Sequence, residues 1–292
     1  MIYVCGVSPA FDLTLELDSL DDDRVNRVRN ERRIAAGKAL NAARELTRLG
    51  QSCVLFGLAG RESWEEYTNG AASLPNAPEE ISLAMTDGAV RENLTLLVGG
   101  KTIKINRKGA VCAKEHIAVL KKMLLERMAA DEGERIVIFT GSMPEGMTSD
   151  DYADLMQAAG DAGARIAVDT AALSREQLLD VSPWLIKPNE HELAHICGLS
   201  DPDDEQLLRA ARQLADDGIG IVLLTLGSRG LICVTKDETV RVPAEPIKAV
   251  NTVGAGDCAL AGFVAAAVQG KPVRQCAQQA AHCGSRAAAL PD

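Results

Sequence analysis

Residues 251–257 of the chain have the sequence NTVGAGD, and the apolar run 258–268 that follows at once predicts a helix. The first backbone N–H groups of a helix have no partners within it and lie at the positive end of its dipole. Gly254, Ala255 and Gly256 therefore present amides where an anion can approach closely. Asp257, directly after them, is suited to take a proton from a nucleophile that attacks phosphorus. The same residues also fit an ordinary helix start in which Asp257 complements the dipole.

Apolar runs of strand length alternate along the chain with segments of helical periodicity. This alternation predicts an α/β fold, a three-layer sandwich in which helices cover both faces of a mostly parallel central sheet. With 292 residues, of which 47% are hydrophobic and 3% aromatic, the chain suits one domain over residues 1–292. The predicted strands are 3–6, 52–56, 135–140, 165–169, 184–187 and 219–225, and the predicted helices are 38–49, 113–128, 149–162 and 205–217.

Two segments interrupt this alternation and predict a second, smaller sheet. Residues 13–17 with 28–34, and 92–98 with 101–106, form pairs of short strands, and Gly99-Gly100 is a good hairpin turn. We expect a mostly antiparallel, discontinuous β lid of about residues 12–34 and 91–108 that covers a site and excludes water. The alternative is that these segments are extra edge strands of the main sheet. An apolar face on such a lid would also favour a homodimer through the lid.

The charge of the chain bears on its partners, and its cysteine content bears on the compartment in which it works. With 31 basic and 41 acidic residues, the chain has a formal charge of −10, which disfavours nucleic acid and anionic membranes. The eight cysteines include no Cys-x-x-Cys pair, which favours a reducing cytoplasm over a disulfide framework. The chain begins directly with a predicted strand, and no apolar run reaches the roughly 20 residues that span a bilayer. We therefore expect a cytoplasmic protein that binds small molecules.

A second motif, KPNEHEL at residues 187–193, follows a predicted strand and begins a helix. Asn189 and Glu192 are three residues apart and share one face of that helix. An amide and a carboxylate at this spacing suit a hydrated Mg²⁺ on the phosphates of a nucleotide, and Lys187 precedes them. The same pair also suits a capping box at the start of the helix, and the two roles are compatible.

The same segment contains a competing motif, because residues 191–195 have the His-Glu-x-x-His spacing of zinc proteases. In those enzymes the motif lies well inside a long helix, whereas here it begins just after a proline in an alternating βα chain. This context favours surface positions for His191 and His195 over a zinc site.

Further polar and glycine residues follow other predicted strands, at the edge where ligands of parallel sheets bind. Thr225, Gly227 and Gly230 can line the phosphates or ribose of a nucleotide, although they also fit a plain hairpin turn. Asp12 can hold two hydroxyls of a polyol, and Lys38 supplies a charge for an anionic group. The remaining candidates for acceptor binding are Gly37, Asn41, Arg91, Asn106 and Ser142.

In this order the motifs resemble the phosphofructokinase B (ribokinase-like) family of carbohydrate kinases, from Ser8 to about Ala288. The most specific parts are TVGAGD at 252–257 and KPNxxE at 187–192, supported by GSxP at 141–144. The resemblance implies an α/β sandwich with a small β lid, and it implies ATP and Mg²⁺. It implies that Asp257 is the catalytic base, that the amides of 254–256 form an anion hole, and that Asn189 and Glu192 organise Mg²⁺ and the triphosphate. The positions that it implies for sugar binding are Asp12, Gly37, Lys38, Asn41 and Arg91.

Within the family, PAFD at 9–12 and GKALN at 37–41 most resemble the branch of 1-phosphofructokinases and tagatose-6-phosphate kinases. This implies a phosphorylated ketose as acceptor, in the first case fructose 1-phosphate converted to fructose 1,6-bisphosphate. Ala36 and Ala39 stand where the branch usually has glycines, and Cys258 stands where it has serine. These departures leave three alternatives: a tagatose-6-phosphate kinase, a kinase of an unphosphorylated sugar or nucleoside, and a non-catalytic sugar-phosphate sensor.

Overall fold

A nine-stranded sheet forms the centre of the protein in the computed structural model, which describes residues 1–290. Its strand order is β13-β12-β11-β10-β9-β8-β1-β4-β5, and it is parallel from β11 to β5, with β12 and β13 antiparallel at one edge. The strands are β1 (Ile2–Gly6), β4 (Cys53–Gly60), β5 (Glu80–Thr86), β8 (Ile136–Thr140), β9 (Arg165–Asp169), β10 (Leu185–Ile186), β11 (Ile221–Thr225), β12 (Leu231–Thr235) and β13 (Thr239–Val242).

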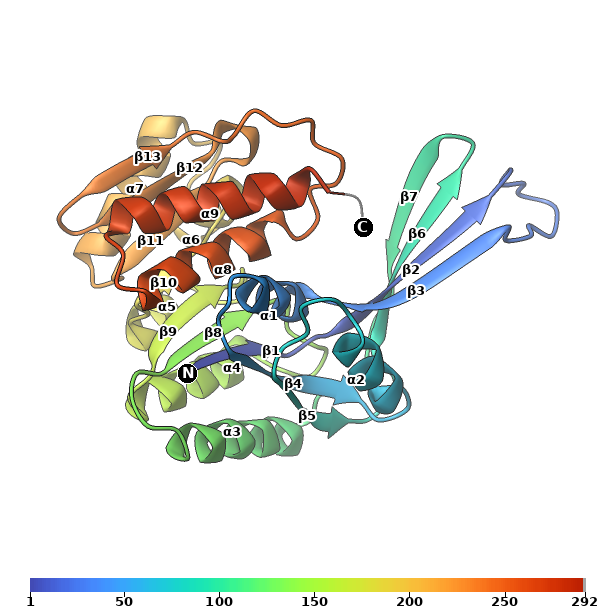
Figure 1. Ribbon diagram of the computed structural model, residues 1–292, viewed down its shortest axis with the longest axis horizontal. Coiled ribbons are helices and arrows are strands. Elements are labelled where there is room, and N and C mark those ends of the chain that lie inside the picture. The colour runs from blue at the N-terminus through green and yellow to red at the C-terminus, as the bar shows by residue number, and fades with distance from the viewer. Residues whose placement is uncertain (291–292) are drawn as a thin grey trace.

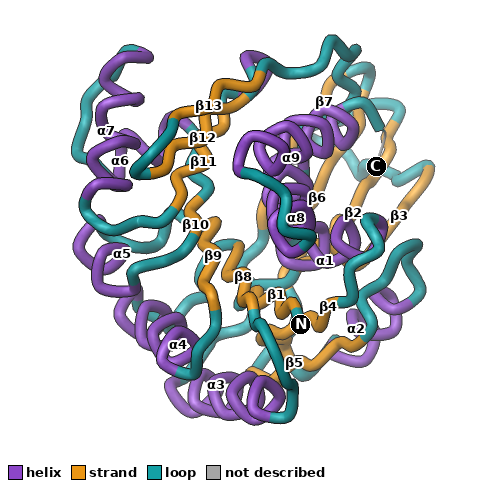
Figure 2. The backbone as a smooth tube through the Cα atoms, turned by 60° about the vertical axis from the view of Figure 1, so that its left-hand side comes forward, coloured by secondary structure: helices purple, strands orange, loops and turns teal. Residues whose placement is uncertain are grey.

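Helices cover both faces of this sheet, so the predicted three-layer sandwich is confirmed (Figure 1, Figure 2). Successive residues of a strand point to opposite faces, so in β1 Val4 packs in one apolar core and Tyr3 in the other. One layer contains α1 (Lys38–Arg48), α2 (Trp64–Ala72), α8 (Ala255–Val268) and α9 (Val273–Ala288), and the other contains α3 (Lys114–Ala129), α4 (Ser149–Asp161), α5 (Arg175–Val181), α6 (Glu190–Ile196) and α7 (Asp204–Asp216).

A separate four-stranded sheet, the β lid, projects from the main body (Figure 1). Its strand order is β3-β2-β6-β7, in which β2 and β6 run parallel and the other two pairs are antiparallel. The prediction of a small, mostly antiparallel sheet is therefore confirmed, and the alternative of edge strands on the main sheet is wrong. The strands are β2 (Ala10–Leu17), β3 (Asn30–Ala36), β6 (Arg91–Val98) and β7 (Lys101–Asn106).

The region from 53 to 86 is more regular than its sequence indicates. β4 is buried along its whole length and continues to Gly60, although Gly57 in its middle weakens the strand pattern. A Cβ at Gly57 would lie 2.2 Å from the carbonyl oxygen of Gly6 on β1, so the glycine allows close approach of the two strands. α2 and β5 follow, and the sequence did not predict either of them.

None of the described helices is long and apolar enough to cross a membrane. The eight cysteines all lie within residues 1–290 and are free thiols, most of them buried. Buried thiols of this kind contribute as small apolar side chains.

Candidate active site

The glycine turn is the backbone of the site. Gly254 precedes α8 in a left-handed conformation, with φ 76°, which a glycine adopts without strain. A Cβ at Gly254 would lie 3.2 Å from Nδ2 of Asn41, and one at Gly256 would lie 3.2 Å from Nζ of Lys187. The turn thus packs against an amide and an ammonium group, and its small residues leave a positive cradle at the N-terminus of a 14-residue helix.

Asp257 is 4% exposed, in the first turn of α8. Asn41 on α1 donates a hydrogen bond from Nδ2 to Asp257 Oδ2 at 3.0 Å. Burial, and after it the charge of Asp169, raise the pKa of Asp257 to about 6, against the lowering effects of Asn41, Lys38 and Lys187. A carboxylate with this pKa is mostly ionised at neutral pH and remains basic enough to accept a proton.

Asp169 is the central charged residue of the site, and the sequence analysis gave it no role. It ends β9, is 1% exposed, and accepts a hydrogen bond from Thr140 Oγ1 at 3.3 Å. Its two oxygens pair with Lys187 Nζ at 3.1 Å and Lys38 Nζ at 3.7 Å. Burial opposes its ionisation, but the charges of Lys187 and Lys38 lower its pKa overall. The sequence does offer one signal for Asp169. It is a carboxylate at the end of an apolar strand, on the edge of the sheet where ligands bind.

Asp169 also affects the pKa of Lys38 and lies in contact with Lys187. Burial lowers the pKa of Lys38, but the negative charges of Asp169, Asp257 and Glu192 raise it overall. Lys187 is only 5% exposed and lies against Asp169. Two cations are therefore held in the site close to Asp257, where they can face a polyphosphate.

Asn189 and Glu192 form the capping box of α6. Asn189 Oδ1 accepts from the backbone N–H of Glu192, and Glu192 Oε2 accepts from that of Asn189, both at 2.9 Å. Glu192 also lines the main cleft, and the backbone N–H of Thr225 donates to the carbonyl oxygen of Pro188. Gly227 and Gly230 lie in the tight connection from β11 to β12, both with positive φ, so the hairpin lies beside the start of α6.

The zinc alternative finds no support in the structure. His191 and His195 are exposed, and α6 is a helix of seven residues. Among residues 1–290, no three or more His, Cys, Asp and Glu side chains are grouped so as to hold a metal ion.

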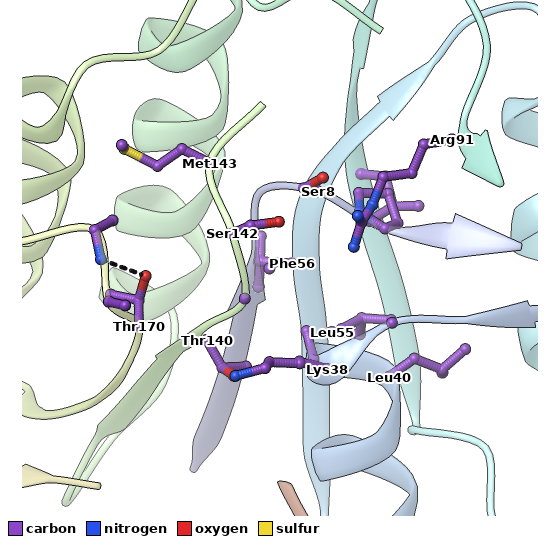
Figure 3. Close-up of a pocket in the computed structure, with 18 of the residues that line it drawn as sticks. Ser8, Lys38, Leu40, Leu55, Phe56, Arg91, Thr140, Ser142, Met143 and Thr170 are labelled. Carbon is purple, nitrogen blue, oxygen red and sulfur yellow. Dashed lines mark hydrogen bonds between the residues drawn. The ribbon is translucent and has the colours of Figure 1, made fainter. Parts of the chain in front are cut away.

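A cleft of about 490 Å³ lies between the main sheet and the β lid (Figure 3). Lys38 extends toward Thr140 in Figure 3, and both side chains contact Asp169. Arg91 lies in another part of the cleft, where burial lowers its pKa, and its buried Nε has no hydrogen-bond partner among the described residues. Of the residues singled out from the sequence, those lining the cleft are Gly37, Lys38, Arg91, Asn106, Ser142 and Glu192.

A second pocket of about 220 Å³ adjoins the cleft and shares Arg91 and Ser142 with it. Arg107 and Lys108 also line this pocket, so three cations surround it. Asp12 does not line either pocket, and its Oδ1 accepts from Asn93 Nδ2 at 2.8 Å across the lid. The structure thus separates the group around Asp257, which lines neither of these two pockets, from a basic end of the cleft beneath the lid.

The two alanines of the Lys38 loop are accommodated by their neighbours. A Cβ at Gly6 would lie 2.3 Å from the Cβ of Ala39, so Ala39 occupies space that Gly6 leaves open. The carbonyl of Ala36 accepts a hydrogen bond from the hydroxyl of Tyr67 at 2.9 Å. Gly37 between them has φ 120°, a conformation that strongly favours glycine, and this glycine is retained.

These features are those of a phosphotransferase, and comparison with known proteins specifies the family. A model of the pfkB family of carbohydrate kinases matches residues 4–289, and the chain belongs to this family. Over 285 residues it is 31% identical to a 1-phosphofructokinase of Rhodobacter capsulatus, covering 96% of this chain and 87% of that protein. Over 286 residues it is 29% identical to a D-tagatose-1-phosphate kinase of Bacillus licheniformis, covering 98% of this chain and 91% of the relative.

The fold is that of ribokinase. The structure of Arabidopsis thaliana ribokinase is similar, with a TM-score of 0.78 at 20% identity, over 99% of this chain and 93% of that one. The predicted ribokinase-like fold and the resemblance to the 1-phosphofructokinase and tagatose kinase branch are therefore confirmed. The protein is a carbohydrate kinase.

Because Asp169 pairs with the buried Lys187 and with the partly exposed Lys38, its replacement by asparagine leaves the buried charge of Lys187 without a full partner. We expect Asp169→Asn to lower the free energy of unfolding by about 3–5 kcal/mol, measured by urea denaturation at neutral pH. The control is Asp154→Asn. It removes the partner of Lys121, but the Asp154 side chain is 67% exposed. That change should cost no more than about 1 kcal/mol. Equal losses in the two variants would contradict the central role of Asp169.

Proposed function

We propose that this protein transfers the γ-phosphoryl group of ATP to a hydroxyl of a ketose 1-phosphate, converting fructose 1-phosphate to fructose 1,6-bisphosphate. The observation that carries this proposal is the constellation around Asp257. A buried carboxylate with a pKa of about 6 lies directly after the amides of 254–256, next to two buried or half-buried lysines. A base, an anion cradle and fixed cations are the parts that phosphoryl transfer requires.

In this scheme Asp257 takes the proton of the acceptor hydroxyl as its oxygen forms a bond to the γ-phosphorus. The bond from that phosphorus to the leaving ADP oxygen breaks, and the amides of Gly254, Ala255 and Gly256 stabilise the charge of the transferring group. Lys187, whose Nζ lies beside the glycine turn at Gly256, adds positive charge at the triphosphate. Mg²⁺, when bound, adds charge neutralisation at the phosphates, and Asn189 and Glu192 are the residues suited to orient its water ligands. Thr225, Gly227 and Gly230 are suited to the nucleotide, since their hairpin lies beside the start of α6.

Replacement of the base provides the most direct test. We expect Asp257→Asn to retain ATP binding, measured by calorimetry, and to lower kcat by about 10²–10⁴-fold or more because no group accepts the proton. In the wild type, kcat/KM should decrease as the pH falls through about 6, because protonated Asp257 cannot act as a base. Near-normal turnover of Asp257→Asn, or an activity independent of pH from 5 to 8, would refute the assignment.

The acceptor is proposed from the basic end of the site. Arg91, Arg107 and Lys108 surround the smaller pocket, although Arg107 also pairs with Glu92, and Lys108 with Glu145 at 3.0 Å. The buried Nε of Arg91 has no hydrogen-bond partner among the described residues and can donate to a phosphate oxygen. The names of the two relatives, a 1-phosphofructokinase and a D-tagatose-1-phosphate kinase, support a ketose 1-phosphate over the alternatives. Lys38, Asn41 and Asp12 then remain candidates for orienting the sugar.

We expect Arg91→Ala to raise KM for fructose 1-phosphate about tenfold or more, because a charge-assisted hydrogen bond to phosphate is lost. The KM for ATP should change little, and a panel including tagatose 6-phosphate, fructose and nucleosides tests the alternatives. Arg209→Ala, at a 64% exposed arginine of α7, is the control and should leave both constants unchanged. If no phosphosugar is preferred over its unphosphorylated form, the phosphate site is refuted. If no acceptor on the panel is phosphorylated at all, the sensor alternative gains support.

We also propose that the β lid covers the acceptor and pairs with the lid of a second copy. In β6 and β7 the face with Arg91 and Asn106 contributes to the cleft, so alternate residues point to the opposite face. That opposite face is aliphatic across three strands, and none of its members is fully buried. An apolar sheet face of this kind is an expected dimer interface. Its members are Leu13, Leu15, Leu94, Leu96, Ile103 and Ile105.

The oligomeric state tests this interface. Ile105 is 46% exposed, and we expect Ile105→Glu to convert a dimer to a monomer, because a charge would be buried in an apolar contact. Thr102→Glu, on the same strand but the cleft-facing side, should leave the dimer intact. Sedimentation equilibrium measures both. A monomeric wild type, or dissociation by both substitutions, would contradict pairing through this face.

A further inference from the structure

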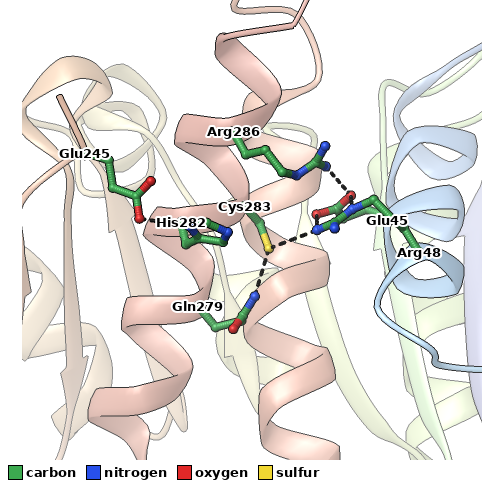
Figure 4. A network of polar contacts seen from close by, with 7 residues as sticks. All are labelled: Glu45, Arg48, Glu245, Gln279, His282, Cys283 and Arg286. Atoms are coloured by element: carbon green, nitrogen blue, oxygen red, sulfur yellow. Dashed lines mark hydrogen bonds and ion pairs between the residues drawn. The ribbon is translucent and has the colours of Figure 1, made fainter. Parts of the chain in front are cut away.

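Glu45 is a buried carboxylate that the proposed function does not use. It lies on α1 and is 3% exposed (Figure 4). Arg48 of the same helix binds it with two hydrogen bonds, Nε to Oε2 and Nη2 to Oε1, each 2.7 Å long. Arg286 of α9 donates from Nη2 to Glu45 Oε2 at 2.5 Å. The Glu45–Arg286 pair is thus an ionic tether between two helices that are separated by 241 residues in the sequence.

A buried ion pair adds little to stability compared with apolar residues of the same size, but it fixes relative position. Aliphatic side chains keep their contact when one helix slides slightly against another. A carboxylate gripped by two guanidinium groups satisfies its hydrogen bonds in one arrangement only. The tether between Glu45 and Arg286 therefore sets the register of α1 against α9.

α9 in turn is packed closely against α8. Cys283 of α9 lies where α8 has Gly262, and a Cβ on that glycine would be 2.8 Å from Cys283 Sγ. Arg48 Nη2 lies 3.9 Å from the same sulfur, and Gln279 Nε2 lies 3.3 Å from it. The glycine allows the close approach and leaves α9 little freedom to shift along α8. Holding α9 in place therefore also restricts the movement of α8.

The same helix holds the segment that leads into the glycine turn. His282 Nδ1 lies 2.8 Å from Glu245 Oε1, and the Ser285 hydroxyl accepts from the backbone N–H of Glu245 at 3.2 Å. The carbonyl of Ala288 accepts from the N–H of Val250 at 2.8 Å. α9 thereby contacts α1, α8 and the approach to the turn, which are the three elements that meet at Asp257.

Asn41 lies one helical turn before Glu45 on α1, at i−4, so the two side chains share a face of the helix. One of them bonds to Asp257 on α8 and the other to Arg286 on α9. We propose that Glu45 is a positioning residue, which through Arg286 fixes α1 in the register that keeps the Asn41 amide on the Asp257 carboxylate. This proposal rests on the proposed role of Asp257 as base.

The test is Glu45→Gln, which retains the shape of the side chain and removes its charge. We expect kcat to fall about ten- to a hundredfold, since small displacements of reacting groups have effects of this size. The KM values for ATP and fructose 1-phosphate should stay within about twofold. The acid limb of the kcat–pH profile should move to higher pH, because the Asn41 hydrogen bond lowers the pKa of Asp257 and would be weakened.

Glu45→Gln leaves the other charges near Asp257 and residue 45 unchanged, so those charges would not account for a shift of the acid limb. Asn41→Ala should shift the acid limb in the same direction, and the double variant should shift it no further than Asn41→Ala alone, because both substitutions act through one contact. The charged and titratable groups concerned are Asp169, Lys38 and Lys187 around Asp257, and Arg48, Arg286, Cys258 and Cys283 around Glu45.

Arg48→Met is the matched control, because it removes a guanidinium of the same cluster but leaves the tether to α9. The acid limb of the kcat–pH profile of Arg48→Met should stay at the wild-type position. A Glu45→Gln enzyme with a wild-type pH profile, additive shifts in the double variant, or an equal shift in Arg48→Met each overturns the proposal, whatever the change in Tm. If Glu45→Gln does not fold, Arg286→Lys, which keeps a cation but alters the contact, serves the same comparison. Failure of the proposed function is distinguishable, because Asp257→Asn would then remain active.

Discussion

The pairing of Asp169 with Lys187 and Lys38 is the interaction on which the site depends. A carboxylate buried to this degree is costly without a counter-charge, and Asp169 is 1% exposed. Lys187 and Lys38 pair with its two oxygens, so the carboxylate and the two ammonium groups hold one another in place. Burial, and after it the charge of Asp169, raise the pKa of Asp257. One buried acid therefore links two cations to the carboxylate of Asp257.

The fold explains how so few residues can be brought together from distant parts of the chain. Thr140 ends β8, Asp169 ends β9 and Lys187 follows β10, and these strands are neighbours in the parallel sheet. Parallel strands deliver their carboxyl ends to the same edge, so the polar residues there converge without any long loop. α1 and α8 pack on one face of the sheet and contribute Lys38 and Asp257 from their N-terminal turns. The positive ends of both helices are thereby directed at the same region.

The sequence predicted most of this fold, and the physical basis of each success is specific. β9 matches its predicted range, because five residues between two helical segments form one buried run. Asp257 was identified because glycines before an apolar helix are a local signal. Asp169 has no such signal, since a single acid at a strand end has no characteristic spacing. Glu45 is a related case, because its partner Arg286 lies on a helix 241 residues later and no local pattern reveals it. β5 escaped prediction because it is only partly buried, which weakens its apolar pattern.

The group around Asp257 and the basic end of the cleft are built under different constraints. The group around Asp257 consists mostly of buried residues that hold one another through ion pairs and hydrogen bonds, so a substitution there disturbs several partners at once. The basic end is built partly from the lid, where the residues of β7 are exposed and their contacts are few. Substitutions on an exposed strand change which ligand is bound at little cost in stability. Acceptor preference would accordingly depend more on the lid end of the cleft than on the buried group around Asp257.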